Sequence, residues 1–361
     1  MAPNAFEYLQ NLESLFLFSN NMNLGPQHAN LFKPLTTCRK LNLSFNNIEY
    51  LDPNCFDNMF NLIEMNISSN RVHFVSTNTS IFDSLVNLTV LNIGYNKMPV
   101  IMGSFFKNLT SLKSLTLRGC DATEIEIDAF KNLNQLKSLD LTSNFLTTLP
   151  KGVFNGLECL EDINFLNNNL TQLDDDLFDN LRNLRSIWLS SNMIKVVKAS
   201  WFKSLSNLKD FYIGNNELKV IEDKAFYNLK NLHKLDLSFN SNLKECLTSK
   251  PLFSELINLK TLSIENCGID MIQTSMFEGL VNLETLNIAR NNIKSITATP
   301  LASMVNLKKL NLSANPIESF ELDVVKVFTK IESIVMSRNE VANLEGLRTF
   351  SLNRRFILSI D

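Results

Sequence analysis

Long apolar runs and an excess of one charge are both missing from this sequence. No stretch approaches the roughly 18 consecutive apolar residues that a membrane-spanning helix needs, so no transmembrane segment and no membrane contact are expected. Lys and Arg number 34 and Asp and Glu number 37, which gives a formal net charge of −3 over 361 residues. This near balance provides no electrostatic case for a nucleic-acid partner or an anionic membrane surface.

Residues in catalytic or metal-binding arrangements are also missing. The three histidines, His28, His73 and His233, fall at unrelated positions, and no G-x-S-x-G, G-x-G-x-x-G, P-loop or H-E-x-x-H motif occurs. The run Asp174–Asp176 lacks the Gly and the spaced oxygens of a calcium loop, which favours a solvated charge cluster. The sequence therefore predicts a non-enzymatic protein that needs no metal or other cofactor.

The residues that are abundant point to internal repetition. Hydrophobic residues make up 45% of the chain, which is ample for a packed interior and rules out wholesale disorder. Gly and Pro number only 10 and 9, whereas Phe numbers 26 and Asn close to fifty. So skewed a composition indicates a repetitive chain rather than the two domains that length alone would suggest.

A frame of the form L-x-x-L-x-L-x-x-N recurs along almost the whole chain, as in the segment from Leu136 to Asn144. Neighbouring copies are 24 residues apart in ten of thirteen cases, and 26, 26 and 27 residues apart in the others. The fourteen copies begin at Leu12, Cys38, Leu62, Leu88, Leu112, Leu136, Leu160, Leu184, Leu208, Leu232, Leu259, Leu283, Leu307 and Ile331. The sequence thus predicts one solenoid of about fourteen repeats over residues 1–361, with a poorly defined terminal segment at 345–361.

Each repeat combines a strand with a return segment. Leucines alternate with polar residues in x-L-x-L-x, the period of a strand with one buried face, so stacked copies are expected to form a parallel sheet. A Phe six residues before each start closes the interior from the other side, with Leu301 and Val325 replacing it in the last two copies. No single coil buries its apolar side alone, and stability therefore comes from stacking.

The final position of the frame is a column of asparagines. An amide has two donors and an acceptor, so at the turn after a strand it satisfies backbone groups that would otherwise be buried unpaired. Cys120 and Cys267 interrupt the column with small, buriable thiols. We predict a structural ladder made of Asn20, Asn46, Asn70, Asn96, Asn144, Asn168, Asn192, Asn216, Asn240, Asn291, Asn315 and Asn339.

This pattern resembles the leucine-rich repeat superfamily, and within it the 24-residue class with a Phe spine. That class includes Toll and Toll-like receptor ectodomains, Slit, chaoptin and related adhesion proteins. The resemblance implies an α/β solenoid of horseshoe shape, with one curved parallel sheet on the concave face and irregular or short helical segments on the convex face. It implies recognition rather than catalysis, although the scaffold serves many different partners.

Features that secreted members of the class usually carry are missing here. Residues Met1 to Phe6 begin within a repeat, without a basic or apolar leader, and no Cys-rich cap is present at either end. We expect a fragment or truncated gene product of an extracellular or cell-surface protein. The alternative is a complete cytoplasmic protein whose first and last coils serve as caps.

The six cysteines do not decide the compartment. Cys38 takes a core leucine position, and buried unpaired thiols are expected at most of the six sites. The pair Cys246 and Cys267 belongs to successive coils and is the one in which a disulfide is conceivable. The oxidation state of this pair is therefore left open by the sequence.

The sequence holds seven N-x-[ST] sequons, about as many as chance predicts in so Asn-rich a chain. Three of them would place sugar on the strand face itself, and Asn78 lies in the extra loop of a 26-residue repeat, where a glycan is easily accommodated. The candidate glycosylation sites are Asn42, Asn66, Asn78, Asn87, Asn108, Asn169 and Asn311.

The middle variable position of each strand faces outward, and most copies fill it with a small polar residue. Trp188 and Tyr212 are the exceptions in neighbouring repeats, and they either stack on each other as part of the column or anchor a partner. Carboxylates around them would favour a basic partner surface. The candidate partner-binding patch on the concave face comprises Trp188, Tyr212, Asp162, Asp210, Asp140, Asp236 and Leu166.

These observations favour non-enzymatic recognition, within the ectodomain of a Toll-like or adhesion-type receptor in innate immune or cell-surface signalling. The resemblance implies a protein, glycan or microbial ligand and a receptor dimer. A secreted matrix or adhesion protein without signalling remains an alternative, as does an intracellular leucine-rich repeat scaffold. The ligand could also bind the convex or lateral face.

Overall fold

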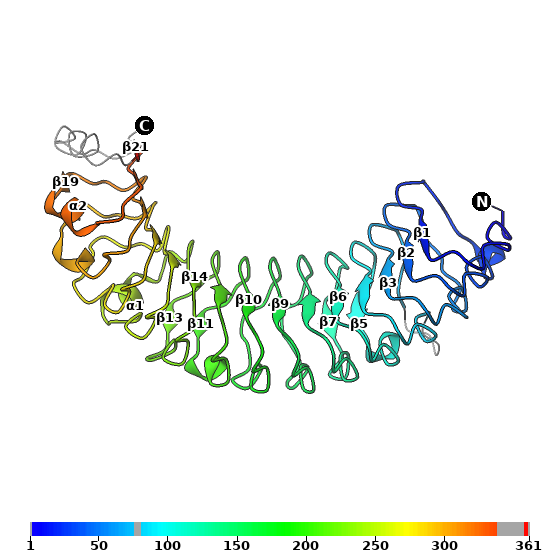
Figure 1. Cartoon of the computed structure of the whole chain (residues 1–361). Helices are drawn as coiled ribbons and strands as arrows, with labels where there is room; N and C mark the ends of the chain where they lie inside the picture. Colours follow the sequence, from blue (N-terminus) through cyan, green and yellow to red (C-terminus); the bar gives the residue numbers. More distant parts are fainter. Residues whose placement is uncertain (1, 76–80, 338–356, 360–361) are drawn as a thin grey trace. The chain divides into compact units, whose positions relative to one another are not determined.

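The computed structural model describes residues 2–75, 81–337 and 357–359 (Figure 1). It contains two compact units. Unit 1 spans Met1–Leu184 and unit 2 spans Arg185–Asp361. Each unit is a stack of coils built on its own run of parallel strands. The assignment of 1–361 to one solenoid domain stays a prediction.

In unit 1 each coil contributes one three-residue strand to a parallel sheet. The central residues of the strands pair in register, as in Leu41 with Met65 and Met65 with Leu91, and all three are buried. In chain order the strands are β1 (Ser14–Phe16), β2 (Lys40–Asn42), β3 (Glu64–Asn66), β4 (Val90–Asn92), β6 (Ser114–Thr116), β8 (Ser138–Asp140) and β9 (Asp162–Asn164). The return segments hold the strand pair β5 (Val100–Ile101) and β7 (Glu124–Ile125), and the 3-10 helices η1 (Pro26–His28) and η2 (Gly103–Phe105).

Unit 2 repeats this arrangement. Its sheet strands are β10 (Ser186–Trp188), β12 (Asp210–Tyr212), β14 (Lys234–Asp236), β15 (Thr261–Ser263), β16 (Thr285–Asn287), β18 (Lys309–Asn311), β20 (Ser333–Val335) and β21 (Ile357–Ser359). The return segments contain β11 (Val196–Val197) paired with β13 (Val220–Ile221), and β17 (Ser295–Ile296) paired with β19 (Ser319–Phe320). They also contain η3 (Ala199–Phe202), η4 (Thr299–Leu301), and the five-residue helices α1 (Lys244–Thr248) and α2 (Asp323–Val327).

The predicted fold is confirmed as a parallel-sheet solenoid with little helix. A sheet strand begins two residues after the start of every predicted repeat, from β1 after Leu12 to β20 after Ile331. The helix α1 occupies the one 27-residue repeat, which accommodates its extra residues. The segment 345–361 was predicted to be poorly defined, and within it Ile357–Ser359 pairs with β20 as β21. The rest of 338–361 lies outside the described residues.

The Phe residues of the return segments form buried spines inside each unit. In unit 1 the rings of Phe32 and Phe56 have centroids 5.6 Å apart, and in unit 2 those of Phe202 and Phe226 lie 5.9 Å apart. All four side chains are essentially inaccessible to solvent. Because these rings pack on a ring of the next coil, their burial depends on the presence of neighbouring coils.

The asparagine column makes the backbone contacts that a ladder requires. Asn144 shows the pattern: its Oδ1 accepts hydrogen bonds from the N–H groups of Cys120 and Ala122, both at 3.0 Å. Its Nδ2 donates to the carbonyls of Leu117 and Leu141, both at 2.9 Å. The amide of Asn144 thus joins its own turn to the turn of the preceding coil, whereas, within the described residues, the exposed amide of Asn20 donates only to the Phe18 carbonyl of its own turn. Of the predicted ladder, Asn339 lies outside the described residues.

The two thiols of the ladder replace only part of this bonding. The Sγ of Cys120 donates to the Ile93 carbonyl at 3.6 Å, and that of Cys267 donates to the Leu237 carbonyl at 3.3 Å. Burial raises the pKa of both thiols to about 12, so both stay protonated near neutral pH. All six cysteines are free thiols in the structure, including the pair Cys246 and Cys267.

Candidate functional site

The two aromatic residues singled out by the sequence lie side by side on the sheet of unit 2. Trp188 ends β10 and Tyr212 ends β12, and the two residues are register partners in the parallel ladder. Their flanking residues Ile187 and Phe211 are buried, so strand alternation turns Trp188 and Tyr212 to the opposite face. The two rings stack with centroids 5.9 Å apart and planes 6° apart.

Stacking changes how much of each ring is presented to solvent. Trp188 and Tyr212 are half-buried, whereas the sequence suggested two exposed aromatics. Each ring covers one face of the other, because the strand spacing of about 4.8 Å brings register partners into stacking distance. The rings therefore form one two-ring platform rather than two independent side chains.

Charged groups surround this platform, and one of them is positive. The Oδ1 of Asp210 lies 3.9 Å from the Nζ of Lys234 on the next strand, β14. Burial raises the pKa of Tyr212, and the nearby Asp210 carboxylate adds to the rise, so its hydroxyl stays protonated near neutral pH. Lys234, which the sequence analysis missed, partly compensates the charge of Asp210. We call Trp188, Asp210, Tyr212, Lys234 and Asp236 the aromatic patch.

Asp236 has a structural contact as well as a charge. Its Oδ1 accepts a hydrogen bond from the backbone N–H of Ser238 at 3.0 Å, and Asp140 in unit 1 binds the N–H of Thr142 in the same way at 2.9 Å. Asn42 and Asn66 occupy this position in other repeats and accept the same bond. The two carboxylates thus shape the turn after the strand, a role that the sequence analysis did not assign to them.

The remaining predicted patch residues belong to unit 1. Asp162 starts β9, Asp140 ends β8 beside Asn164, and the N–H of Leu166 donates to the Asn164 Oδ1 at 2.9 Å. All three predicted residues are half-buried. The structure therefore brings together Trp188, Tyr212, Asp210 and Asp236 within unit 2. Their combination with Asp140, Asp162 and Leu166 into one surface stays a prediction.

The predicted glycosylation sites differ in their surroundings. Asn42, Asn66 and Asn311 are half-buried on the sheet face, and each amide oxygen accepts the backbone N–H two residues on. Asn169 is half-buried. Asn87 and Asn108 are exposed. Asn78 lies outside the described residues.

The sequence analysis missed a second column of asparagines. These residues stand directly before the start of a repeat, and each donates its Nδ2 to a carbonyl of the preceding coil. The signal in the sequence is an Asn-Leu pair at many repeat starts. Members with this contact are Asn61, Asn87, Asn183, Asn231, Asn258, Asn282 and Asn306.

The described part of the chain also bears on metal binding and membrane crossing. There, no cluster of three or more His, Cys, Asp or Glu residues is arranged to hold a metal ion. The described helices are all too short to cross a membrane. The acidic run at Asp174–Asp176 contributes an exposed ion pair, with Asp176 Oδ2 lying 3.1 Å from Lys151 Nζ.

Models of leucine-rich repeats match most of the chain. A BspA type leucine rich repeat region matches residues 123–246, and a leucine rich repeat model matches residues 61–121 and 257–317. A further leucine rich repeat model matches residues 37–59. A search of curated protein sequences found no match.

Solved structures with the same fold come from animals and bacteria. A chain of the Toll–Spatzle complex from Drosophila matches with a TM-score of 0.76 and 23% identity, over 96% of this chain and 53% of that chain. The internalin InlF from Listeria monocytogenes matches with a TM-score of 0.70 and 21% identity, over 98% and 88%. A chain of the TLR13–ssRNA13 complex matches with a TM-score of 0.52 and 22% identity, over 94% and 58%. This chain thus spans about half the length of the Toll-complex chain.

Proposed function

The chain belongs to the leucine-rich repeat superfamily and resembles Toll-like ectodomains, and on that premise we propose that it is the recognition segment of an extracellular animal receptor. In this proposal it binds a protein partner without catalysis, and the aromatic patch of unit 2 is the contact. Binding is passed on by receptor dimerisation, in innate immune or cell-surface signalling.

The observation that carries the proposal is the stacked pair Trp188 and Tyr212, in a column whose other residues are polar except in the first and last repeats, at Phe16 and Val335. Stacking fixes both rings before a partner arrives, so little side-chain entropy is lost on binding. Large aromatic side chains with a polar surround are the usual anchors of protein interfaces. The ring face that each residue leaves uncovered suits an aliphatic or cationic side chain of the partner.

Charge favours a protein over a nucleic acid at this patch. Asp210 and Asp236 flank the rings, and Lys234 compensates only part of their charge. A phosphate backbone would be repelled there, whereas a basic protein surface would be attracted. The Toll chain that shares this fold is named with a protein partner, Spatzle, which supports the same choice.

An array of extracellular domains tests the proposal. The purified chain, assembled as a tetramer to raise its avidity, is applied to arrayed secreted and cell-surface domains, and each positive partner is then measured by surface plasmon resonance. We expect Trp188→Ala to cost over about 1 kcal/mol of binding, more than about fivefold in Kd, without loss of folding. Phe145→Ala is the matched control, because Phe145 is an exposed aromatic of unit 1 outside the patch.

Equal affinity of the Trp188→Ala variant and the wild type would refute the patch as the contact. The two ends of the full-length transcript separate the receptor from its alternatives. A leader and cap upstream, with a membrane span and a signalling domain downstream, are expected for the receptor. A secreted matrix protein would lack the membrane span and the signalling domain, and an intracellular scaffold would start at Met1.

A further inference from the structure

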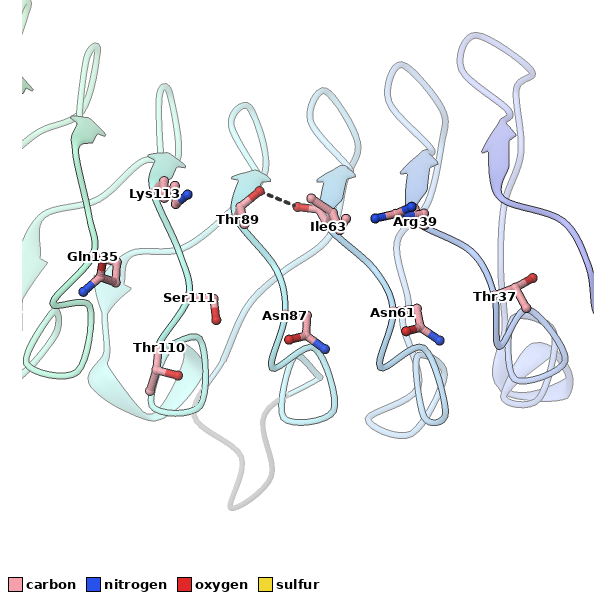
Figure 2. Close-up of a pocket in the computed structure, with 10 residues that line it drawn as sticks. All are labelled: Thr37, Arg39, Asn61, Ile63, Asn87, Thr89, Thr110, Ser111, Lys113 and Gln135. Atoms are coloured by element: carbon pink, nitrogen blue, oxygen red, sulfur yellow. Dashed lines mark hydrogen bonds between the residues drawn. The ribbon is translucent and has the colours of Figure 1, made fainter.

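A hollow of about 790 Å³ lies beside the segments that lead into β2, β3, β4 and β6 of unit 1 (Figure 2). We call it the lateral groove. Most of its lining belongs to two columns, the residue directly before and the residue directly after the first position of each repeat. The lining residues are Thr37, Arg39, Asn61, Ile63, Asn87, Thr89, Thr110, Ser111, Lys113 and Gln135.

A hollow of about 320 Å³ lies in the same two columns of unit 2, beside Lys260, Glu284 and Lys308. The lateral groove is larger, and two neighbouring repeats that border it carry unusual residues. In the column directly after the repeat start, twelve of the fourteen residues are Lys, Arg, Glu or His, and only Ile63 and Thr89 depart from this rule. These two side chains are short, and the Thr89 hydroxyl is turned to the backbone, donating to the Ile63 carbonyl at 3.1 Å. Long charged side chains narrow the equivalent hollow of unit 2, whereas the short side chains of Ile63 and Thr89 leave more space between Arg39 and Lys113.

A sequon stands inside this space. Thr89, which removes the charge from the column, also completes the sequon Asn87-Leu88-Thr89. Asn87 is exposed, and its Nδ2 donates to the Phe60 carbonyl of the preceding coil at 2.8 Å. Figure 2 shows the amide nitrogen of Asn87 turned toward the coil that carries Asn61. The Nδ2 atom, to which an N-linked glycan attaches, thus lies along the groove rather than away from it.

The lining chemistry suits the first sugars of such a glycan. Ser111 and Gln135 offer neutral hydrogen-bonding groups, and the half-buried Ile63 offers an apolar surface for the carbon face of a sugar ring. The Thr37 hydroxyl donates to the Gln10 carbonyl at 2.7 Å and therefore offers a sugar only an acceptor. No carboxylate is among the lining residues. Within the described residues Arg39 and Lys113 form no ion pair, so their N–H groups are available to sugar oxygens.

The sequons of the sheet face lack this arrangement. At Asn42 and Asn66 the amide oxygens accept hydrogen bonds from the backbone of the turn. The third residues of these two sequons, Ser44 and Ser68, are buried. We propose that Asn87 is an N-glycosylation site, and that the lateral groove holds the first sugars of its glycan. This proposal rests on the extracellular location proposed above. A glycan in the groove would close this side of unit 1 to partners.

Glycopeptide mass spectrometry tests the site directly. The full chain is expressed in insect cells behind a secretion signal, so that the test does not depend on the native location. Peptide N-glycosidase F in ¹⁸O water marks each occupied asparagine. We expect Asn87 to carry a glycan, either in the secreted protein or in the protein extracted from the cells. An unmodified Asn87 in both fractions overturns the proposal.

A second measurement separates a glycan held in the groove from one that hangs free. Ile63→Lys restores the usual long charged side chain and fills the hollow, while Ile63→Val keeps it open. Native release of the Asn87 glycan by the glycosidase should be about threefold or more slower in the wild type and in Ile63→Val than in Ile63→Lys, because packing shields the linkage. Equal release rates in all three proteins overturn the groove. The binding measurement with Trp188→Ala tests the aromatic patch of unit 2, whereas the glycan measurements test unit 1. Failure of the glycan proposal is therefore distinguishable from failure of the proposed function.

Discussion

The side-chain oxygen of Asn144 accepts a hydrogen bond from the backbone N–H of Cys120 at 3.0 Å, and so joins two consecutive positions of the ladder. Asn144→Ala would leave that N–H and the N–H of Ala122 buried without an acceptor, and would remove a donor from two carbonyls. Each buried unpaired group costs about 1–3 kcal/mol, so we expect a loss of at least about 2 kcal/mol in unfolding free energy. Urea unfolding followed by circular dichroism measures it.

The matched control for this variant is Cys120→Asn, which restores the usual residue of the ladder. It should change the unfolding free energy by less than about 1 kcal/mol, since the new amide makes bonds that its neighbours in the column already make. A loss in Cys120→Asn as large as that in Asn144→Ala would contradict a ladder based on hydrogen bonds.

The spine residue Phe154 gives a second prediction. Its ring is 2% exposed and lies 6.3 Å from that of Phe130. Phe154→Ala should cost about 3–5 kcal/mol of unfolding free energy, through lost burial and the cavity left behind. Phe145→Ala removes an aromatic side chain that is 55% exposed, and should cost less than about 0.5 kcal/mol. The idea of a buried spine is wrong if the two variants unfold at the same urea concentration.

The fold was predictable because a local pattern that is weak in one repeat recurs in every repeat, and the recurrence makes it recognisable. The strand β8, for example, has only three residues, but its frame recurs every 24 residues and fixes which of them face inward. The terminal strand β21 was not predicted, although Ser333 and its partner Ile357 keep the 24-residue spacing, because the position of the repeat start is occupied by Arg355 rather than a leucine.

The candidate site was predictable only as a set of positions. Sequence spacing placed Trp188 and Tyr212 in one column, but the angle between their rings depends on side-chain rotation that no pattern encodes. The contact of Lys234 with Asp210 was missed although the two residues hold the same position in neighbouring repeats. The lateral groove follows from Ile63 and Thr89, whose effect appears only once neighbouring side chains are placed.

Thiol reactivity gives a third prediction. Cys38, Cys55, Cys120 and Cys267 are buried, whereas Cys159 and Cys246 are partly accessible. A disulfide reagent at pH 8 should therefore modify two thiols of the native protein rapidly, and all six after denaturation. Four reactive thiols in the denatured, unreduced protein would reveal a disulfide, with Cys246 and Cys267 as the first pair to examine.

Alkaline pH should weaken the fold through the same thiols. The pKa of Cys120 is raised by burial from 9.0 to about 12, so its contribution to stability is complete below pH 9 and is lost as the pH rises toward 12. The unfolded chain releases this proton first, which lowers the unfolding free energy by up to about 1.4 kcal/mol per pH unit and thiol. In urea titrations under reducing conditions from pH 8 to 10.5, the unfolding free energy should fall less steeply with pH for Cys120→Ala than for the wild type. An equally steep fall of the unfolding free energy in the two proteins would contradict a raised pKa of the Cys120 thiol.

The charge of the aromatic patch can be removed without disturbing its turn, because asparagine replaces Asp236 in the equivalent position of several repeats and accepts the same hydrogen bond. For a basic partner found in the array, Asp236→Asn should lower the association rate by about twofold at low salt. This is the effect of losing an interaction of about 0.4 kcal/mol between unit charges about 10 Å apart in water. Asp174→Asn, which removes an exposed carboxylate of unit 1 outside the predicted patch, is the control, and the effect of Asp236→Asn should fade at high salt. An association rate that is unchanged at every salt concentration, in a variant that melts like the wild type, would show that Asp236 serves the turn alone.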